Sequence, residues 1–268
     1  MSFDLGPALL FCPADRPERF VKAAERADAV IVDLEDAVLP DAKERARANL
    51  LDADLDPGRV VVRVNAPGTH DFAADLDALA VTPFRSVMVA KSEEPDALDA
   101  FDESYRVIAL CETARGIRAA DRIAAHPRVV GMMWGAEDLV ASLGGTSSRR
   151  PDGTYRDIAR YARSRVLLEA GAHGKAAIDA VHIDIDDIAG LEEEAADAVA
   201  SGFAATACIH PAQVAAIRAA YRPGETELLW ARAVLAAALG ERGVFRFEGR
   251  MIDEPVLRHA RAVISRAG

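Results

Sequence analysis

The hydrophobic and polar positions along the chain repeat in one pattern: a short apolar run, a polar loop and then a segment with helical spacing. Several of the apolar runs are nearly continuous and rich in β-branched residues, which is typical of parallel strands covered on both faces. The predicted strands are residues 8–12, 29–34, 60–64, 86–90, 107–111, 129–134, 178–183 and 203–209.

Helical spacing lies between these runs, for example at residues 17–27, 42–50, 113–125 and 158–170. Eight strand–helix units in about 220 residues favour an α/β fold of the closed (β/α)8 TIM-barrel type. An open doubly wound sheet stays as the alternative, because the repeat of strands and helices does not show whether the sheet closes into a barrel. After residue 220 the pattern changes to a long helix and a last helix from Pro255. We therefore expect a catalytic barrel at 1–222 and a C-terminal helical extension, a lid, at 223–268.

Composition narrows the classes of partner. The chain has 268 residues, 51% of them hydrophobic, and a formal net charge of −11. An acidic chain lacks the basic surface that nucleic acids require, whereas a few local arginines can still bind anionic small molecules. No apolar stretch is long enough for a membrane span, and no signal-peptide pattern opens the sequence. Three isolated cysteines fit buried, reduced side chains, so we expect a cytoplasmic protein without a membrane partner.

Charged and polar residues follow nearly every predicted strand. In a barrel these positions meet at the carboxyl-end rim, where the chemistry of such folds gathers. Carboxylates brought together repel one another, which predicts a cation among them. The rim positions are Glu35, Asp36, Arg63, Lys91, Glu112, Asp138, Asp184 and His210.

Glu112 and Asp138 follow consecutive strands and are the predicted metal ligands. Carboxylate oxygens suit Mg²⁺, with Mn²⁺ as an alternative, and the lack of a His/Cys cluster argues against zinc. Each acid could instead cap the helix that follows it. Arg63 has the fork geometry for a carboxylate or phosphate ligand, or it could form a structural ion pair with Glu35 or Asp36. Arg16 lies near a predicted helix start, where anions are favoured, or is an ordinary surface arginine.

Several motifs resemble a known family in the same order along the chain. The chain is similar to the citrate lyase β-subunit-like proteins of the HpcH/HpaI aldolase superfamily, and most similar to their stand-alone actinobacterial type. The resemblance covers nearly the whole chain and is specific for the family, but less so for the substrate. The motifs are LFCPADRPERF, VIVDLEDAV, VVRVN, ALCETARG, GMMWGAEDL, HIDIDDIAGL, CIHPAQV and GRMIDEP.

This resemblance implies a TIM barrel that uses Mg²⁺ to cleave or form a carbon–carbon bond in a β-hydroxyacyl-CoA thioester. The acyl group would be of the malyl, citramalyl, citryl or hydroxymethylglutaryl type, with coenzyme A as part of the substrate. It implies that Glu112 and Asp138 bind the metal. The implied substrate-binding residues are Arg63, Glu112, Arg16, Gly135 and Ala136.

The resemblance also implies the catalytic residues and the assembly. Asp253 in GRMIDEP matches an aspartate that related lyases insert into a neighbouring subunit's site, which implies a homotrimer or a dimer of trimers. Glu35 and Asp36 are further candidates for proton transfer. Many relatives carry a lysine before the IHP segment, but residues 202–206 here read GFAAT, so one basic contact is missing.

Two other functions fit the same residues. A class II aldolase acting on a pyruvate-derived hydroxy acid would keep the metal site without coenzyme A. A non-catalytic subunit would keep the barrel as a scaffold or acyl-CoA sensor. The intact acids and Arg63 argue against loss of catalysis.

Overall fold

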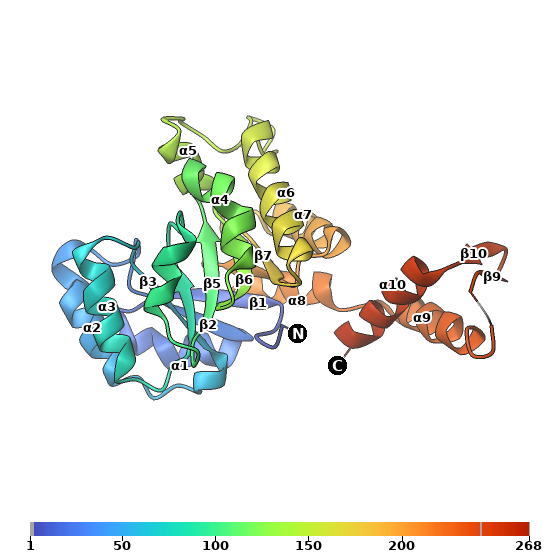
Figure 1. Ribbon diagram of the computed structural model, residues 1–268, viewed down its shortest axis with the longest axis horizontal. Helices are drawn as coiled ribbons and strands as arrows, with labels where there is room; N and C mark the ends of the chain where they lie inside the picture. Colours follow the sequence, from blue (N-terminus) through green and yellow to red (C-terminus); the bar gives the residue numbers. More distant parts are fainter. Residues whose placement is uncertain (1–2, 242, 268) are drawn as a thin grey trace. The chain divides into compact units, whose positions relative to one another are not determined.

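The chain forms a closed eight-stranded parallel barrel followed by a smaller C-terminal unit. The computed structural model describes residues 3–241 and 243–267. The chain divides into two compact units between Ile217 and Arg218. The first unit holds the barrel, and its strands and surrounding helices can be followed by colour from blue to light orange (Figure 1). The predicted TIM barrel with C-terminal helices is therefore confirmed.

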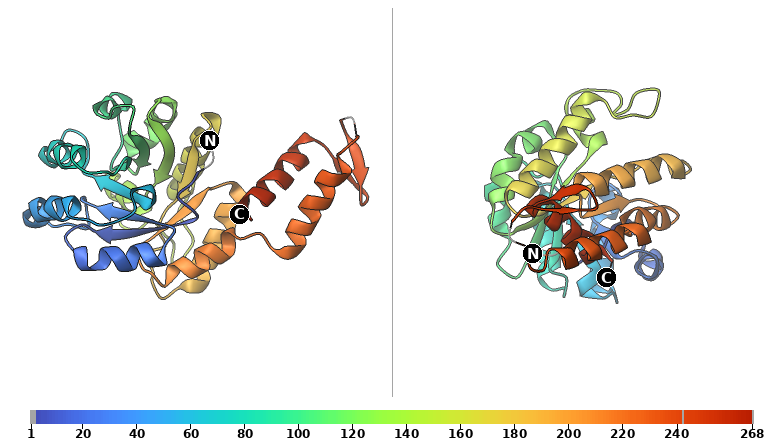
Figure 2. Two further views of the ribbon diagram at one scale, coloured as in Figure 1. Left: turned by 90° about the horizontal axis from the view of Figure 1, so that it is seen from below. Right: turned by 90° about the vertical axis from the view of Figure 1, so that its right-hand side faces the viewer.

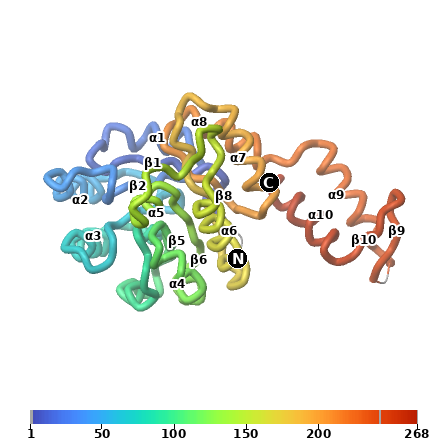
Figure 3. Tube along the Cα trace, turned by 90° about the horizontal axis from the view of Figure 1, so that it is seen from above, coloured from blue at the N-terminus to red at the C-terminus, as the bar shows by residue number. Residues whose placement is uncertain are grey.

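The barrel strands pair in sequence order, and β1 pairs with β8 to close the ring. Figure 3 shows the helices of this unit arranged around the strands. The strands are β1 (Ala8–Pro13), β2 (Ala29–Asp33), β3 (Val60–Val64), β4 (Ser86–Val89), β5 (Arg106–Cys111), β6 (Val129–Trp134), β7 (Ala176–Asp179) and β8 (Ala205–Cys208).

Helices cover the outer face of the barrel, except that the β4–β5 connection holds the 3-10 turn Pro95–Ala100 instead of an α-helix. The segment predicted as one helix at 17–27 is a 3-10 turn, Pro17–Arg19, followed by α1. The α-helices of this part are α1 (Phe20–Arg26), α2 (Lys43–Leu51), α3 (His70–Ala80), α4 (Ala114–Ala125), α5 (Ala136–Ser142), α6 (Asp157–Ala172), α7 (Ile188–Ser201) and α8 (Gln213–Tyr221).

Buried apolar side chains explain why these runs form strands. Every residue of β2 is buried, as a strand covered on both faces requires. The barrel interior is filled with side chains from successive strands, including Leu9, Ile31, Val61 and Met88. The interior is therefore a packed core, and the functional cavity must lie at the rim.

The predicted bounds are correct for β3 and β6 and differ by one residue for β1, β2, β4 and β5, whereas those of β7 and β8 are wrong by more. β7 is Ala176–Asp179, so the predicted 178–183 strand began late and ran into a loop, and Asp184 does not close a strand. The alternation of Val181 and Ile183 with polar residues imitates a strand, although Ile183 is exposed. β8 is Ala205–Cys208, so it begins two residues after the predicted start and ends one residue before the predicted end.

The C-terminal unit has a hydrophobic core of its own. It contains α9 (Glu225–Ala237), a hairpin of β9 (Phe245–Phe247) and β10 (Arg250–Ile252), and α10 (Glu254–Arg266). α9 and α10 lie side by side, with the hairpin joining them at one end (Figure 2). Val234, Ile252 and Val263 are among its buried residues. In neither described range is any helix long and apolar enough to cross a membrane.

Candidate active site

A cavity of about 190 Å³ opens at the carboxyl ends of the barrel strands. Of the predicted rim residues, Arg63, Glu112 and Asp138 line it, and Glu35 and Lys91 are ion-paired with these residues. A larger cavity of about 450 Å³ lies beside α6 and α7, and it holds none of the predicted site residues. The smaller cavity is the candidate active site because it joins acids, an arginine and an apolar floor. Its lining is Phe11, Asp33, Ala37, Arg63, Leu110, Glu112, Met133, Trp134, Gly135, Ala136, Glu137, Asp138, Ala180, Val181 and Ile209.

Arg63 is held rigidly at the end of β3. Its Nε and Nη2 donate to the two carboxylate oxygens of Asp33 at 2.7 and 2.6 Å, and its Nη1 lies 3.3 Å from Oε2 of Glu35. The guanidinium also lies over the ring of Phe11, 4.7 Å from its centroid. Burial opposes the charge, but Asp33 and Glu35 more than offset it and raise the pKa of Arg63. Arg63 is therefore a fixed cation facing the cavity.

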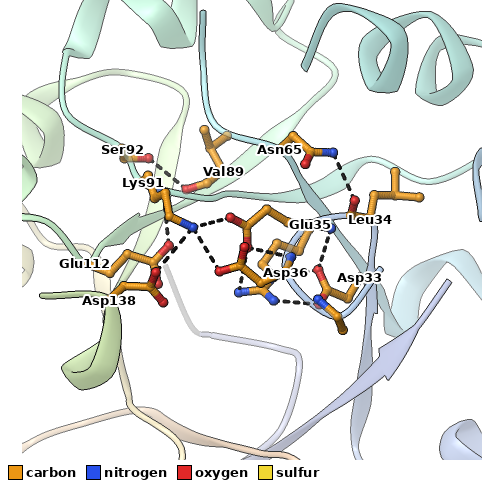
Figure 4. Close-up of polar contacts among 12 residues, drawn as sticks. Asp33, Leu34, Glu35, Asp36, Asn65, Val89, Lys91, Ser92, Glu112 and Asp138 are labelled. Carbon is orange, nitrogen blue, oxygen red and sulfur yellow. Dashed lines mark hydrogen bonds and ion pairs between the residues drawn. The ribbon is translucent and has the colours of Figure 1, made fainter. Parts of the chain in front are cut away.

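Lys91 and the acids after β2 form a second ionic group (Figure 4). The Lys91 ammonium donates to Oε1 of Glu35 and to Oδ2 of Asp36, the latter at 3.0 Å, and lies 3.4 Å from Oδ1 of Asp138. Burial raises the pKa of Glu35, and Arg63 and Lys91 offset part of that rise. Burial also acts against ionisation of Asp36, but the hydrogen bond and charge of Lys91 outweigh it and lower its pKa.

Glu112 and Asp138 come from neighbouring strands, as the sequence predicts. Cys111 and Trp134, the last residues of β5 and β6, are register partners, and Glu112 follows directly while Asp138 lies in the first turn of α5. Figure 4 shows their carboxyl groups next to each other. Burial and the charge of Asp138 raise the pKa of Glu112 to about 8, with Arg63 acting in the opposite direction. This pair carries negative charge that a bound cation would offset.

The donor set fits a hard divalent cation. Both side chains offer carboxylate oxygens, and Asp138 is partly exposed, which leaves room for water or substrate ligands. Within the part of the chain that the structure describes, one group of three ligand-type side chains has its ligand atoms close together: Asp121, Glu169 and His173, on α4 and at the end of α6. These three lie away from the rim, and His173 is already paired with Asp121 at 3.0 Å.

Gly135 makes the close approach of β6 to Glu112 possible. A Cβ atom at this position would lie 2.8 Å from Oε2 and 2.9 Å from Cβ of Glu112, which is too close for any side chain. Its φ of −130° is ordinary extended backbone, so space and not backbone conformation requires the glycine. Gly135 and Ala136, both predicted to contact substrate, line the cavity.

A buried lysine supports the segment that carries Glu35. The Lys43 ammonium donates to the main-chain oxygens of Leu34 and Glu35 at 2.8 and 3.0 Å, and to Oδ1 of Asn65 at 2.7 Å. Asn65 in turn donates to Asp75 at 2.7 Å. All three N–H groups of the ammonium are used, so Lys43 joins the ends of β2 and β3 beneath the site.

A second buried network holds the end of β6. The Trp134 indole donates to Oδ1 of Asp179 at 2.6 Å, and Arg163 on α6 pairs with both oxygens of the same carboxylate. The ring of Tyr155 packs edge-on against Trp134, with centroids 5.2 Å apart. Asp179 therefore ties β7, β6 and α6 together next to the cavity wall.

Sequence reasoning missed Asp33, Lys91 and Asp179 as functional or supporting residues. Asp33 is the last residue of the apolar run of β2, so it reads as part of a buried strand, and its pairing with Arg63 is visible only from the register of β2 with β3. Lys91 was placed at a strand end without a role.

The remaining predicted residues lie outside the cavity lining. Arg16 is exposed, 3.9 Å from Asp15. Asp253 is in the C-terminal unit, where its Oδ1 accepts from the main-chain N–H of Val256 and caps α10. Asp184 lies exposed in the loop after β7.

The comparisons with known proteins agree on one family. The HpcH/HpaI aldolase/citrate lyase family matches residues 8–211. A citrate lyase subunit beta-like protein of Mycobacterium tuberculosis is 58% identical over 264 residues, covering 98% of this chain and 96% of that protein. Human mitochondrial citramalyl-CoA lyase is 31% identical, covering 97% of this chain and 85% of its own length. A (3S)-malyl-CoA thioesterase of Cereibacter sphaeroides is 34% identical, covering 97% of this chain and 94% of that protein.

A solved structure is similar over the same length. The protein CitE of Mycobacterium tuberculosis in complex with magnesium, acetoacetate and coenzyme A superimposes with a TM-score of 0.92 at 57% identity, and 98% of each chain is covered. The order of the motifs, the closed barrel and these matches give one conclusion: this chain belongs to the HpcH/HpaI aldolase/citrate lyase family.

Proposed function

We propose that this protein is a Mg²⁺-dependent carbon–carbon lyase that cleaves or forms β-hydroxyacyl-CoA thioesters. The observation that carries the proposal is the pairing of Glu112 with Asp138 at adjacent strand ends, facing the fixed guanidinium of Arg63 across one cavity. The relatives support it: one is named a citramalyl-CoA lyase, and CitE was solved with magnesium, acetoacetate and coenzyme A.

Glu112 and Asp138 would hold the metal, with Mg²⁺ preferred and Mn²⁺ able to replace it. Mg²⁺ bound there would polarise the carboxylate and hydroxyl oxygens of the substrate and stabilise the charge that develops during cleavage. Arg63 would bind the substrate carboxylate, because Asp33 and Glu35 fix the orientation of its guanidinium and the residue lines the cavity. Gly135 and Ala136 would form the cavity wall against the substrate.

The reaction needs two proton transfers. A base removes the hydroxyl proton, the carbon–carbon bond breaks to release an oxo acid, and the enolate of the acyl-CoA product takes up a proton. Glu35 is the candidate base in the barrel, because burial raises its pKa toward the working range, and Asp36 beside it is a second candidate. Asp253 is the candidate acid for the enolate, on the strength of its match to the family motif.

The C-terminal segment 223–268 would cover the thioester and supply Asp253 to a neighbouring subunit in a homotrimer or dimer of trimers. Arg16, exposed after β1, would contact the coenzyme A part of the substrate. The missing lysine in residues 202–206 removes one further basic contact, so we expect phosphate recognition to depend more strongly on Arg16. A cytoplasmic location agrees with the burial of Cys12, Cys111 and Cys208, which form no disulfide.

A panel of thioesters tests the proposal. Malyl-, citramalyl-, citryl- and hydroxymethylglutaryl-CoA are incubated with the protein, with and without Mg²⁺, and the products are separated. The expected result is an oxo acid and a shorter acyl-CoA from at least one substrate, only with Mg²⁺. Free coenzyme A with an uncleaved hydroxy acid would instead indicate a thioesterase, the activity in the name of one relative.

The same panel addresses the other two functions. Cleavage of free hydroxy acids, but not of their thioesters, would indicate a class II pyruvate-type aldolase. Binding of thioesters without any product, in protein that binds Mg²⁺, would indicate a non-catalytic acyl-CoA-binding subunit. The matched variant is Asp138→Asn, which keeps the shape of the side chain, removes its charge and should abolish turnover.

A further inference from the structure

Lys91 has a backbone conformation that few lysines adopt. Its φ is +47°, in the left-handed region, and in the described part of the chain the other non-glycine residue with positive φ is Glu248. Such a conformation persists only where the surroundings fix it, and it points to a functional constraint. Here the main-chain N–H of Lys91 donates to Oε1 of Glu112 at 3.0 Å. The strained turn therefore orients one candidate metal ligand.

The side chain of the same residue reaches the other candidate ligand. Its ammonium lies 3.4 Å from Oδ1 of Asp138 while it bridges Glu35 and Asp36. Figure 4 shows this ammonium between the pair Glu112 and Asp138 on one side and the acids after β2 on the other. Lys91 thus contacts one ligand through its backbone and the other through its charge.

The charges at the rim explain why the Lys91 ammonium lies among the carboxylates. Five carboxylates meet two cations, Arg63 and Lys91, and Arg63 is committed to Asp33 and Glu35. The Lys91 ammonium is therefore the cation that lies nearest to Asp138. A divalent ion on the Asp138 carboxylate would come within a few ångströms of this ammonium, and like charges at that distance repel strongly. The five carboxylates are those that contact Arg63 or Lys91, namely Asp33, Glu35, Asp36, Glu112 and Asp138.

We propose that Lys91 is a built-in counter-ion of the metal site, whose ammonium neutralises Asp138 in the metal-free protein and withdraws toward Asp36 when the divalent ion binds. This inference rests on the proposed metal site. The Lys91 ammonium has room to move toward Asp36, because the Lys91 side chain is 28% exposed and that of Asp36 is 58% exposed. The backbone contact to Glu112 does not depend on the ammonium, so that ligand keeps its orientation.

The test is the affinity of the full-length protein for Mg²⁺ and Mn²⁺ alone, measured by titration calorimetry without substrate. Lys91→Met keeps the main-chain N–H and the length of the side chain but removes the competing charge. We expect it to bind metal at least about threefold more tightly than the unchanged protein. Lys22→Met, on the exposed face of α1, changes the net charge equally and should leave the affinity unchanged.

Lys91→Arg serves as the second variant, since it keeps a cation and should restore weaker binding, and thermal unfolding checks that each variant folds. Equal or weaker binding by folded Lys91→Met would overturn the proposal, because it would make the ammonium a neutral or supporting group. Failure of both the unchanged protein and Lys91→Met to bind either metal would overturn the metal site itself. Binding only after the lysine is removed would support both.

Discussion

At the scale of single residues, the site depends on how each charge is fixed. Arg63 is the clearest case, because Asp33 accepts from its Nε and Nη2 while Glu35 lies beside Nη1, which fixes the cation at the cavity lining. A lysine has the same charge but cannot make the paired contact. We expect Arg63→Lys to lower kcat/KM by about 100-fold or more, since it loses a charge-assisted pair and the alignment it provides. Steady-state kinetics with the best substrate of the panel measure this.

The matched control for Arg63→Lys is Arg106→Lys. Arg106 also makes a two-point pair with an aspartate, Asp4, but at an exposed position at the start of β5. Its substitution should leave kcat/KM within about twofold, because exposed ion pairs contribute little. Equal losses in the two variants would show that the effect of Arg63→Lys is general and not a matter of substrate alignment.

The lack of room for a side chain at Gly135 predicts an effect of substitution on metal binding. An alanine there would place a methyl group 2.8 Å from the Glu112 carboxylate, so that carboxylate must move. We expect Gly135→Ala to weaken Mg²⁺ binding by about tenfold, which corresponds to roughly 1.4 kcal/mol. Gly171→Ala, at a position with no atom within 4 Å of the added carbon, is the control. Unchanged metal affinity in Gly135→Ala would remove Glu112 from the metal ligands.

The raised pKa of Glu112 predicts how metal binding depends on pH. The carboxyl is protonated below about pH 8 in the metal-free protein, and a metal ligand must be deprotonated. Metal affinity should therefore rise by up to about tenfold per pH unit toward pH 8 and level off above it. The same proton is released on binding. Calorimetry at pH 7 in buffers of different ionisation enthalpy should detect nearly one proton per ion, and at pH 9 almost none.

The raised pKa of Glu112 makes folding stability fall with rising pH, whereas it makes metal affinity rise. A carboxyl whose pKa is raised on folding binds its proton more tightly in the folded state, so the unfolded state holds fewer protons between the two pKa values. The contribution of Glu112 to stability is present below about pH 4.5 and is lost as the pH rises toward 8. Mg²⁺ at pH 8 would reverse this loss, because it binds the ionised form. Proton release that is absent at both pH values would contradict the assignment of Glu112.

At the scale of elements, Asp179 determines how β6 presents the cavity wall. Its carboxylate is shared by the Trp134 indole and by Arg163, and the side chains of Asp179 and Trp134 are buried. Asp179→Ala would leave both donors without their acceptor, and breaking such a buried pair costs about 3–5 kcal/mol. Urea unfolding measures this loss. Asp197→Ala removes the other, exposed partner of Arg163 and should cost less than about 1 kcal/mol. Similar costs for the two would contradict the role of Asp179.

Particular elements show what the sequence could predict. The apolar β-branched residues at the start of β2 and β3 identify their strands, and strand order places Glu112 beside Asp138. β7 was misplaced because Ala176 and Ala177 carry little hydrophobic signal, while the loop after them imitates a strand. The position of Lys91 depends on a left-handed turn, and the pairing of Arg63 with Asp33 depends on register. Both are properties of three-dimensional packing, so no local pattern shows them.

At the scale of the whole molecule, the proposed reaction requires residues from two units that each have their own core. The barrel carries Arg63 and the predicted metal ligands, while Asp253 caps α10 in a unit built on Ala231, Val234 and Ile252. A separate small unit with its own core can serve a barrel other than that of its own chain, which is the arrangement implied by the family motif. The alternative is that each chain completes its own site.

Mixing two inactive variants separates these arrangements. Arg63→Ala disables the barrel but keeps Asp253, and Asp253→Ala does the reverse. If sites are shared between chains, random assembly of equal amounts gives about a quarter of the sites both intact residues, because each site then draws its two parts independently. Co-expressed or co-refolded mixtures should recover about that share of the unchanged activity, whereas separately folded variants that are mixed without subunit exchange should not. A mixture no more active than its parts would place Asp253 in the site of its own chain, since a site completed within one chain always contains one of the two substitutions.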